Sequence, residues 1–320
     1  MTKIISIYKI ILLGLLFSCT IKQPKHELEL HEYYKPLQIP PGTLKLSNNL
    51  FIDDGEISNF SYLEFMYWVE RIYGKNSEEY ISILPDTKVW NDLINIKLCC
   101  IMSDYYLHHP IFKERPVVGV TYEQALKFCK WRSDRVMEYI LIKYKILDHN
   151  PKPHKDSTFS IESYFTEKYK NIKPNPYIRF YPVYSLPDSL TFLKSLPLAD
   201  SINNNNYKYY RKKENTKGLI DIRCIENMVK ECAEDSSVCG FDPTKSCYYI
   251  HLNNYKFLMY KPLLTNLLGN VCEMTIKKGL SFGGSFIDSC ETVKKQHFYS
   301  YTKPNAYTGF RCVCTWKKWP

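Results

Sequence analysis

Apolar side chains recur at helical spacing in the segment that follows Asn59. Ser61 precedes the run and Glu64 stands three residues later, which is the pattern of a capping box. Gly74 follows the last apolar position and is typical of a residue that ends a helix. The sequence therefore predicts an amphipathic helix between Ser61 and Gly74, whose buried face comprises Tyr62, Phe65, Met66, Val69, Ile72 and Tyr73.

A second helix is predicted after the β-rich run Pro116–Val120. Thr121 and Gln124 have the spacing of another capping box, so the helix should begin here. Cys129 falls on its apolar side, where we expect a buried thiol and not a metal ligand. The predicted apolar face comprises Tyr122, Ala125, Leu126, Cys129, Val136 and Ile140.

The remaining pattern is less regular. Leu50–Asp53 predicts a short strand, and the stretch 143–181, rich in Lys, Asn, Pro and Tyr, predicts a long excursion over the surface. Near the C-terminus, glycines at Gly269, Gly283–Gly284 and Gly309 separate short apolar pieces. Glycine marks places where the backbone must turn or pack closely. The C-terminal stretch from Asn266 to Cys314 is therefore predicted to be a loop-rich core.

Composition limits the classes of protein that the chain can belong to. With 320 residues and 45% apolar content, it can bury one large core, and no second domain boundary is evident after residue 38. The net charge is +10, but the Lys residues are scattered and form no dense basic helix. We therefore expect a solvated surface and no nucleic-acid partner.

The N-terminus has the features of an exported protein. Lys3 and Lys9 precede a short apolar run, which is well below the ~20 residues that a membrane span requires. Cys19 follows Leu16-Phe17-Ser18, which resembles a lipobox, whereas an ordinary signal peptide with a chance Cys is the alternative. We predict a lipoprotein signal peptide at 1–18, lipidation of Cys19 and a polar membrane tether at 19–37.

Cysteine usage fits a compartment that permits disulfides. The chain has 12 Cys, so eleven remain beside Cys19. Cys224, Cys232, Cys239 and Cys247 are close enough in sequence to pair among themselves, and their connectivity stays open. No Cys-x-x-Cys pair suggests a zinc site.

Several short motifs stand in a fixed order. They are Asn266–Met274 (NLLGNVCEM), Gly283–Phe286 (GGSF) and Gly309–Arg311 (GFR), with IPPGT from Ile39 and PVVGVTYEQALKFCKWRSDR from Pro116 upstream. Together they resemble the formylglycine-generating-enzyme (sulfatase-modifying-factor) domain, from about Ile39 to Arg311. The resemblance implies an irregular, loop-rich α+β fold of C-type-lectin-like kind over 38–320.

Three further stretches narrow the resemblance. PDTKVW, HHPIF and FCKWRSDRV are similar to segments of the gliding-motility and type IX secretion lipoproteins built on this domain. This resemblance implies an outer-membrane lipoprotein, on the periplasmic face in preference to the cell surface. Its implied partners are the membrane, through the lipid, and other envelope or secretion-machine proteins, in a structural or scaffolding role.

The resemblance also implies a structural calcium site. In the family, the motif N-x-x-G-N-x-x-E holds Ca²⁺ through oxygen atoms, which are the ligands that this hard cation prefers. Carried over to this chain, the ligands are the side chains of Asn266 and Glu273 and the backbone carbonyls of Gly269 and Val271. The alternative is a glycine turn in which Glu273 only caps a neighbouring segment.

The copper centre of the family's oxidases has no counterpart at the matching positions. Two Cys hold Cu(I) there, and this chain has Asp288 and Val293 instead, with Cys290 between them and out of register. We therefore expect no copper and no catalytic residues. The alternatives are an oxidase with a relocated metal centre, and a ligand- or glycan-binding module on the same scaffold.

Overall fold

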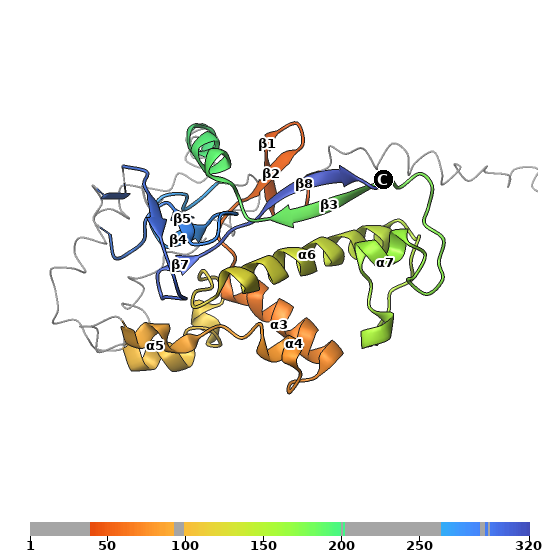
Figure 1. Ribbon diagram of the computed structural model, residues 1–320, viewed down its shortest axis with the longest axis horizontal. Helices are drawn as coiled ribbons and strands as arrows, with labels where there is room; N and C mark the ends of the chain where they lie inside the picture. Colours follow the sequence, from red (N-terminus) through yellow and green to blue (C-terminus); the bar gives the residue numbers. More distant parts are fainter. Residues whose placement is uncertain (1–38, 93–98, 200, 202–263, 289–291, 294) are drawn as a thin grey trace, which may run out of the picture.

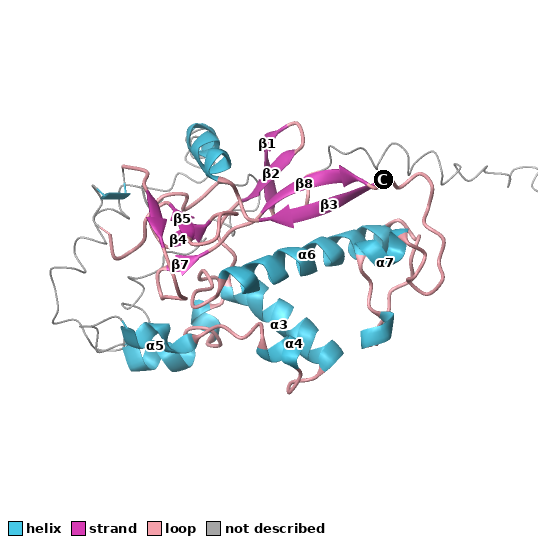
Figure 2. Cartoon of the chain, in the orientation of Figure 1, coloured by secondary structure: helices cyan, strands magenta, loops and turns pink. Residues whose placement is uncertain are grey.

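The computed structural model describes residues 39–92, 99–199, 201, 264–288, 292–293 and 295–320. Within these ranges the chain combines helices with two four-stranded sheets (Figure 1 and Figure 2). The α+β part of the predicted fold class is therefore confirmed.

The first sheet has the strand order β1-β2-β8-β3 and all its neighbours are antiparallel. The predicted strand Leu50–Asp53 is confirmed as β2. It lies next to the C-terminal strand β8, so the two ends of the described fold meet in this sheet. The bounds are β1 Thr43–Ser47, β2 Leu50–Asp53, β3 Phe180–Ser185 and β8 Val313–Lys318.

The second sheet is built from short strands in the order β6-β5-β4-β7. Strand β4 pairs in parallel with β7, and the other two pairs are antiparallel. The residues Phe310–Cys312 connect β7 directly to β8 and therefore link the two sheets. The bounds are β4 Cys272–Met274, β5 Leu280–Phe282, β6 Phe298–Ser300 and β7 Thr308–Gly309.

Helices α3, α4, α6 and α7 lie on one side of the first sheet, and the helical stretch 189–199 packs against its other face. In Figure 1, α6 runs along β3 and β8, and α3 and α4 lie on the other side of α6. No helix among the described residues is long and apolar enough to cross a bilayer. The bounds are α3 Asn59–Tyr73, α4 Glu78–Ile81, α5 Cys99–Tyr105, α6 Tyr122–Lys143 and α7 Ile161–Phe165, with 3-10 turns at Thr87–Asp92, Pro110–Phe112 and Lys155–Ser157 and a further helical stretch at 189–199.

The first predicted helix begins earlier than expected. Its end at Gly74 is confirmed, but Ser58 and not Ser61 is the N-cap, because the Ser58 Oγ accepts the N–H of Ser61 over 3.2 Å. The N–H of Asn59 donates to the carbonyl of Arg115, which lies far away in sequence. Tertiary contacts therefore satisfy the first turn and move the start of the helix.

The second predicted helix begins as expected. Thr121 and Gln124 form a reciprocal capping box at the start of α6. Ala125, Cys129 and Ile140 are buried as predicted. The run Pro116–Val120 forms only an isolated bridge and no strand.

Most positions of the stretch 143–181 are exposed or half-buried, as expected of a surface segment, but the stretch is also docked onto the core, which was not predicted. It includes α7, and six of its apolar residues belong to the largest core cluster. Aromatic and aliphatic side chains spaced between its polar residues point inward and bury apolar area, which favours docking of the whole segment. The six are Leu147, Phe159, Ile161, Tyr164, Tyr169 and Ile178.

Candidate functional site

A buried ion pair occupies the link between the two sheets. Arg311 and Glu273 are 0% and 1% exposed. The Arg311 Nε donates to Glu273 Oε2 over 2.6 Å, and its Nη2 donates to Oε1 over 2.5 Å. This two-point geometry matches a planar guanidinium to a carboxylate. The remaining guanidinium contacts reach the backbone carbonyls of Asp53 at 3.1 Å and Thr265 at 2.8 Å.

Strand pairing positions the two charged groups. Glu273 lies opposite Gly309 in the parallel pair of β4 and β7, and Arg311 follows two residues later. A Cβ on Gly309 would lie 2.8 Å from the backbone oxygen of Val117. Any side chain at this position would therefore prevent β7 from lying so close to Val117. Burial raises the pKa of Glu273, and the charge of Arg311 opposes that rise.

A second buried carboxylate, Glu56, lies between β2 and α3 and is 4% exposed. The Nδ2 of Asn266 donates to its Oε2 over 3.2 Å, and the Nδ2 of Asn270 donates to its Oε1 over 2.7 Å. Burial raises the pKa of Glu56, against the lowering effects of Arg311 and of these amides. Glu56 thus ties the turn before β4 to the N-terminal part of the domain.

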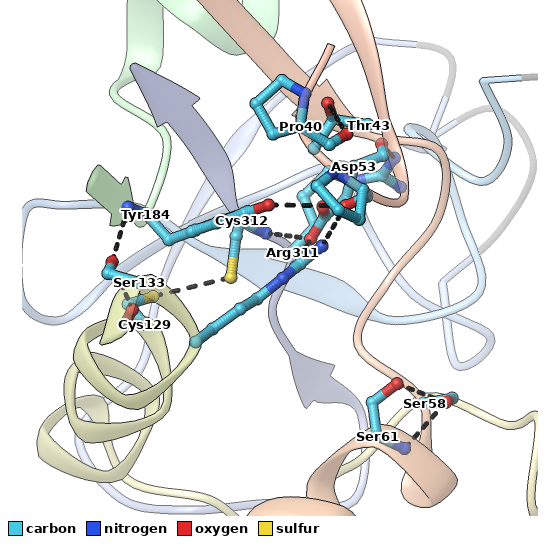
Figure 3. A network of polar contacts seen from close by, with 12 residues as sticks. Pro40, Thr43, Asp53, Ser58, Ser61, Cys129, Ser133, Tyr184, Arg311 and Cys312 are labelled. Carbon is cyan, nitrogen blue, oxygen red and sulfur yellow. Dashed lines mark hydrogen bonds and ion pairs between the residues drawn. The ribbon is translucent and has the colours of Figure 1, made fainter. Parts of the chain in front are cut away.

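A third carboxylate, Asp53, ends β2 and contacts the same link (Figure 3). Its Oδ2 accepts the Nη1 of Arg132 over 2.7 Å and the backbone N–H of Cys312 over 2.9 Å. The Arg132 guanidinium also lies 4.2 Å from the ring centroid of Tyr184, a cation–π contact. These contacts connect α6 to β2 and to β3 of the first sheet.

These three carboxylates and two guanidinium groups form an internal polar centre. A cavity of about 260 Å³ borders Asp53, Glu56 and Arg132. Each carboxylate binds a guanidinium or an amide, so the arrangement holds β2, β4 and α6 together. No group of three or more His, Cys, Asp or Glu side chains within metal-binding distance occurs among the described residues.

The predicted calcium ligands lie in and just after a tight turn. Asn266 and Gly269 have φ of 55° and 77°, the left-handed conformation, and Val271 is fully buried. Both carboxylate oxygens of Glu273 bind Arg311, and the Asn266 amide donates to Glu56. In this arrangement Glu273 would have to leave Arg311 before it could bind a calcium ion, whereas the Asn266 contact uses the amide nitrogen and not the oxygen.

Asp288 and Val293, the positions that the predicted resemblance aligns with copper ligands, lie beside Ser285 and Gly284. The Asp288 Oδ2 accepts the N–H and the hydroxyl of Ser285 over 2.8 and 2.9 Å, so this carboxylate closes a local turn. Val293 packs against Gly284, since a Cβ there would lie 3.0 Å from its Cγ2. Burial raises the pKa of the neighbouring Cys272 thiol to about 12, and Asp288 adds to the rise.

Sequence reasoning did not assign a role to Asp53, Glu56, Arg132 or Arg311. One feature could have identified Arg311, because it is a charged residue inside the apolar stretch GFRCVC. Charges in such stretches are buried and need partners. Cys19, Cys290 and the cysteines between 224 and 247 lie outside the described residues.

No protein-family model, curated protein or solved structure matches this chain.

Proposed function

We propose that this chain is a lipid-anchored envelope protein with a catalytically degenerate formylglycine-generating-enzyme-like domain. It serves as a scaffold in gliding motility or type IX protein secretion, facing the periplasm. The resemblance of the ordered motifs supports the family, and the lipobox-like residues before Cys19 support the anchor. Because a fold alone does not determine function, the scaffold role rests on the narrower resemblance of PDTKVW, HHPIF and FCKWRSDRV to the gliding-motility lipoproteins.

One observation carries the loss of oxidase chemistry. Cu(I) requires soft thiolate ligands, but the two corresponding positions hold Asp288 and Val293. Asp288 is a hard oxygen donor that is already bound by Ser285, and Val293 has no donor atom and fills space beside Gly284. The buried polar groups of the domain instead bind one another and join its own segments.

The proposed partners are the membrane, through the lipid on Cys19, and other envelope or secretion-machine proteins. Nucleic acid is not among them, because the basic residues form no continuous patch in the sequence. Affinity capture from solubilised membranes, followed by mass spectrometry, tests the partners. Recovery of envelope proteins with wild type, but not with Cys19→Ala, would support the anchored scaffold.

Calcium at the turn 266–273 stays a prediction. An ion at 100 times its Kd would add about 2.7 kcal/mol to the free energy of unfolding. Chelation should then lower the melting temperature, and Glu273→Gln should remove that response. Identical melting curves with and without chelator would mean that the turn binds no calcium and that Arg311 is the counter-charge of Glu273.

The decisive experiment is an assay of the family's reaction. Purified protein loaded with Cu(I) is incubated with a Cys-x-Pro-x-Arg sulfatase peptide. We expect no aldehyde product and no stoichiometric binding of copper to the protein. Cys290→Ser is the matched variant, since Cys290 is the thiol nearest in sequence to the two replaced positions. Copper-dependent oxidation that Cys290→Ser eliminates would establish the alternative, an oxidase with a relocated centre.

A further inference from the structure

A cavity of about 580 Å³ lies between α6, α7 and β3 (Figure 1). Its volume is within the range of ~300–1,000 Å³ that small-molecule sites occupy in proteins. None of the residues that line it belongs to the internal polar centre described above. The cavity is therefore a separate feature of the fold, to which the proposed function assigns no role.

Aromatic rings form part of the cavity wall. Trp319 and Tyr181 both line it, and their ring centroids lie 5.7 Å apart in an edge-to-face arrangement. Phe165 stacks on Trp319 with 4.7 Å between the ring centroids, and Phe165 does not line the cavity. The protein thus holds one side of the Trp319 ring, and the ring presents a fixed apolar surface to the cavity.

Polar groups without a partner lie beside this apolar surface. The side-chain hydroxyls of Tyr181 and Ser185 make no hydrogen bond to any part of the protein that the structure describes. Within the described ranges, the same is true of the Glu162 carboxylate and the Lys317 ammonium group, which are exposed. The cavity therefore offers a ligand both donors and acceptors next to aromatic rings.

The charges on the lining residues balance one another. Lys130 and Asp134 pair with each other over 3.6 Å, and Glu162 offsets Lys317. Because Glu162 and Lys317 are exposed, water and salt screen their attraction for an ionic ligand. The lining therefore favours a neutral ligand whose groups both donate and accept hydrogen bonds.

The backbone of β3 does not favour an added peptide strand. This strand lies at the edge of the first sheet, where it pairs with β8. The N–H of Tyr184 points away from β8 and donates to the Ser133 hydroxyl over 2.9 Å. Since the direction of the N–H groups alternates along a strand, Pro182 also faces outward, but proline has no N–H to donate. Both donor positions are therefore closed to a partner strand.

We propose that this cavity binds a saccharide, a class of ligand that combines an apolar ring face with many hydroxyl groups. The C–H face of a pyranose ring packs on Trp319 and Tyr181 and buries apolar area. Its hydroxyls donate to the Glu162 carboxylate and exchange hydrogen bonds with the hydroxyls of Tyr181 and Ser185. Lys317 donates to its oxygen atoms.

A glycan array tests the class of ligand. The full chain is labelled and applied to immobilised neutral, acidic and amino saccharides, with short peptides of mixed sequence on the same surface. We expect retention on a subset of the saccharides and none on the peptides. Retention on no saccharide, or on the peptides alone, would overturn the proposal.

Substitutions locate the binding, with affinity for a retained saccharide measured by titration calorimetry. Glu162→Ala should weaken binding by about 10- to 100-fold, because hydrogen bonds to a charged group are lost. Glu123→Ala is the matched control, since both residues are exposed and lie in the first turn of a helix. Lys317→Ala should also weaken binding, whereas Lys318→Ala, the exposed neighbour outside the cavity, should bind as wild type.

All four substituted side chains are exposed, so each variant should fold. Wild-type affinity in both cavity variants would show that the saccharide binds elsewhere and would overturn the assignment of the cavity.

Discussion

The carboxylate of Glu273 and the guanidinium of Arg311 meet in a two-point contact from which water is excluded. One group lies on β4 and the other in the link between β7 and β8, so this ion pair fastens the two sheets together. Desolvation offsets much of the Coulomb attraction in such a pair. Removing only one partner of the pair is costly, because the charge of the other partner stays buried without a counter-ion.

Replacing one partner of this pair should destabilise the fold strongly. Glu273→Gln leaves the Arg311 charge without its counter-ion, and we expect a loss of about 3–5 kcal/mol in the free energy of unfolding. Chemical denaturation measures it. The exposed pair Lys278–Glu123 provides the control, because Glu123→Gln should cost about 1 kcal/mol or less. Equal losses in the two variants would contradict a buried role for the pair.

The stability of the domain should depend on pH through Glu56. Burial raises its folded-state pKa above the usual 4.5, so the folded state binds the proton more tightly than the unfolded state. This contribution is fully present below pH 4.5 and is lost as pH rises through the folded-state pKa. A tenfold tighter hold on the proton in the folded state corresponds to about 1.4 kcal/mol of stability.

Glu56→Gln is the test of this pH dependence. The amide cannot ionise, so the variant should lose less stability than wild type between pH 4.5 and 8. Denaturant titrations at several pH values within this window measure the difference. Parallel stability curves for the two proteins would mean that Glu56 does not titrate with a raised pKa.

Gly283→Ala should destabilise the C-terminal turn more than an equivalent change elsewhere. Gly283 has a φ of 100°, and a Cβ would lie 2.6 Å from the backbone oxygen of Leu267. Gly74, with a φ of 91° and nothing within 4 Å, is the matched control, where alanine costs about 1–3 kcal/mol of backbone strain. We expect Gly283→Ala to exceed this by about 1–3 kcal/mol of overpacking. A smaller loss than for Gly74→Ala, measured by denaturation, would refute this.

Lipidation should depend on Cys19 alone. Cells expressing wild type or Cys19→Ala are labelled with a fatty-acid analogue and then fractionated. We expect wild type to carry the label and to sediment with membranes, and Cys19→Ala to be unlabelled and either unprocessed or soluble. Cys314→Ala, a change in strand β8, should behave as wild type. Equal labelling of the Cys19 variant would exclude the anchor.

The sequence by itself determined the features that depend on near neighbours. The capping box of Thr121 and Gln124, the end of α3 at Gly74 and the strand β2 all follow from residues within one turn or one strand. Side-chain hydrogen bonds to nearby N–H groups and the helical repeat act over three or four residues, so a pattern of that length is sufficient to predict them.

The tertiary structure decided everything that joins distant segments. The contact between Glu56 and Asn270 spans 214 positions, and the start of α3 depends on the carbonyl of Arg115. Polar residues in the stretch 143–181 suggested a surface segment, yet its apolar side chains complete the core. Pairing a buried charge requires the partner's position in space, and periodicity along the chain carries no information about which distant segment supplies it.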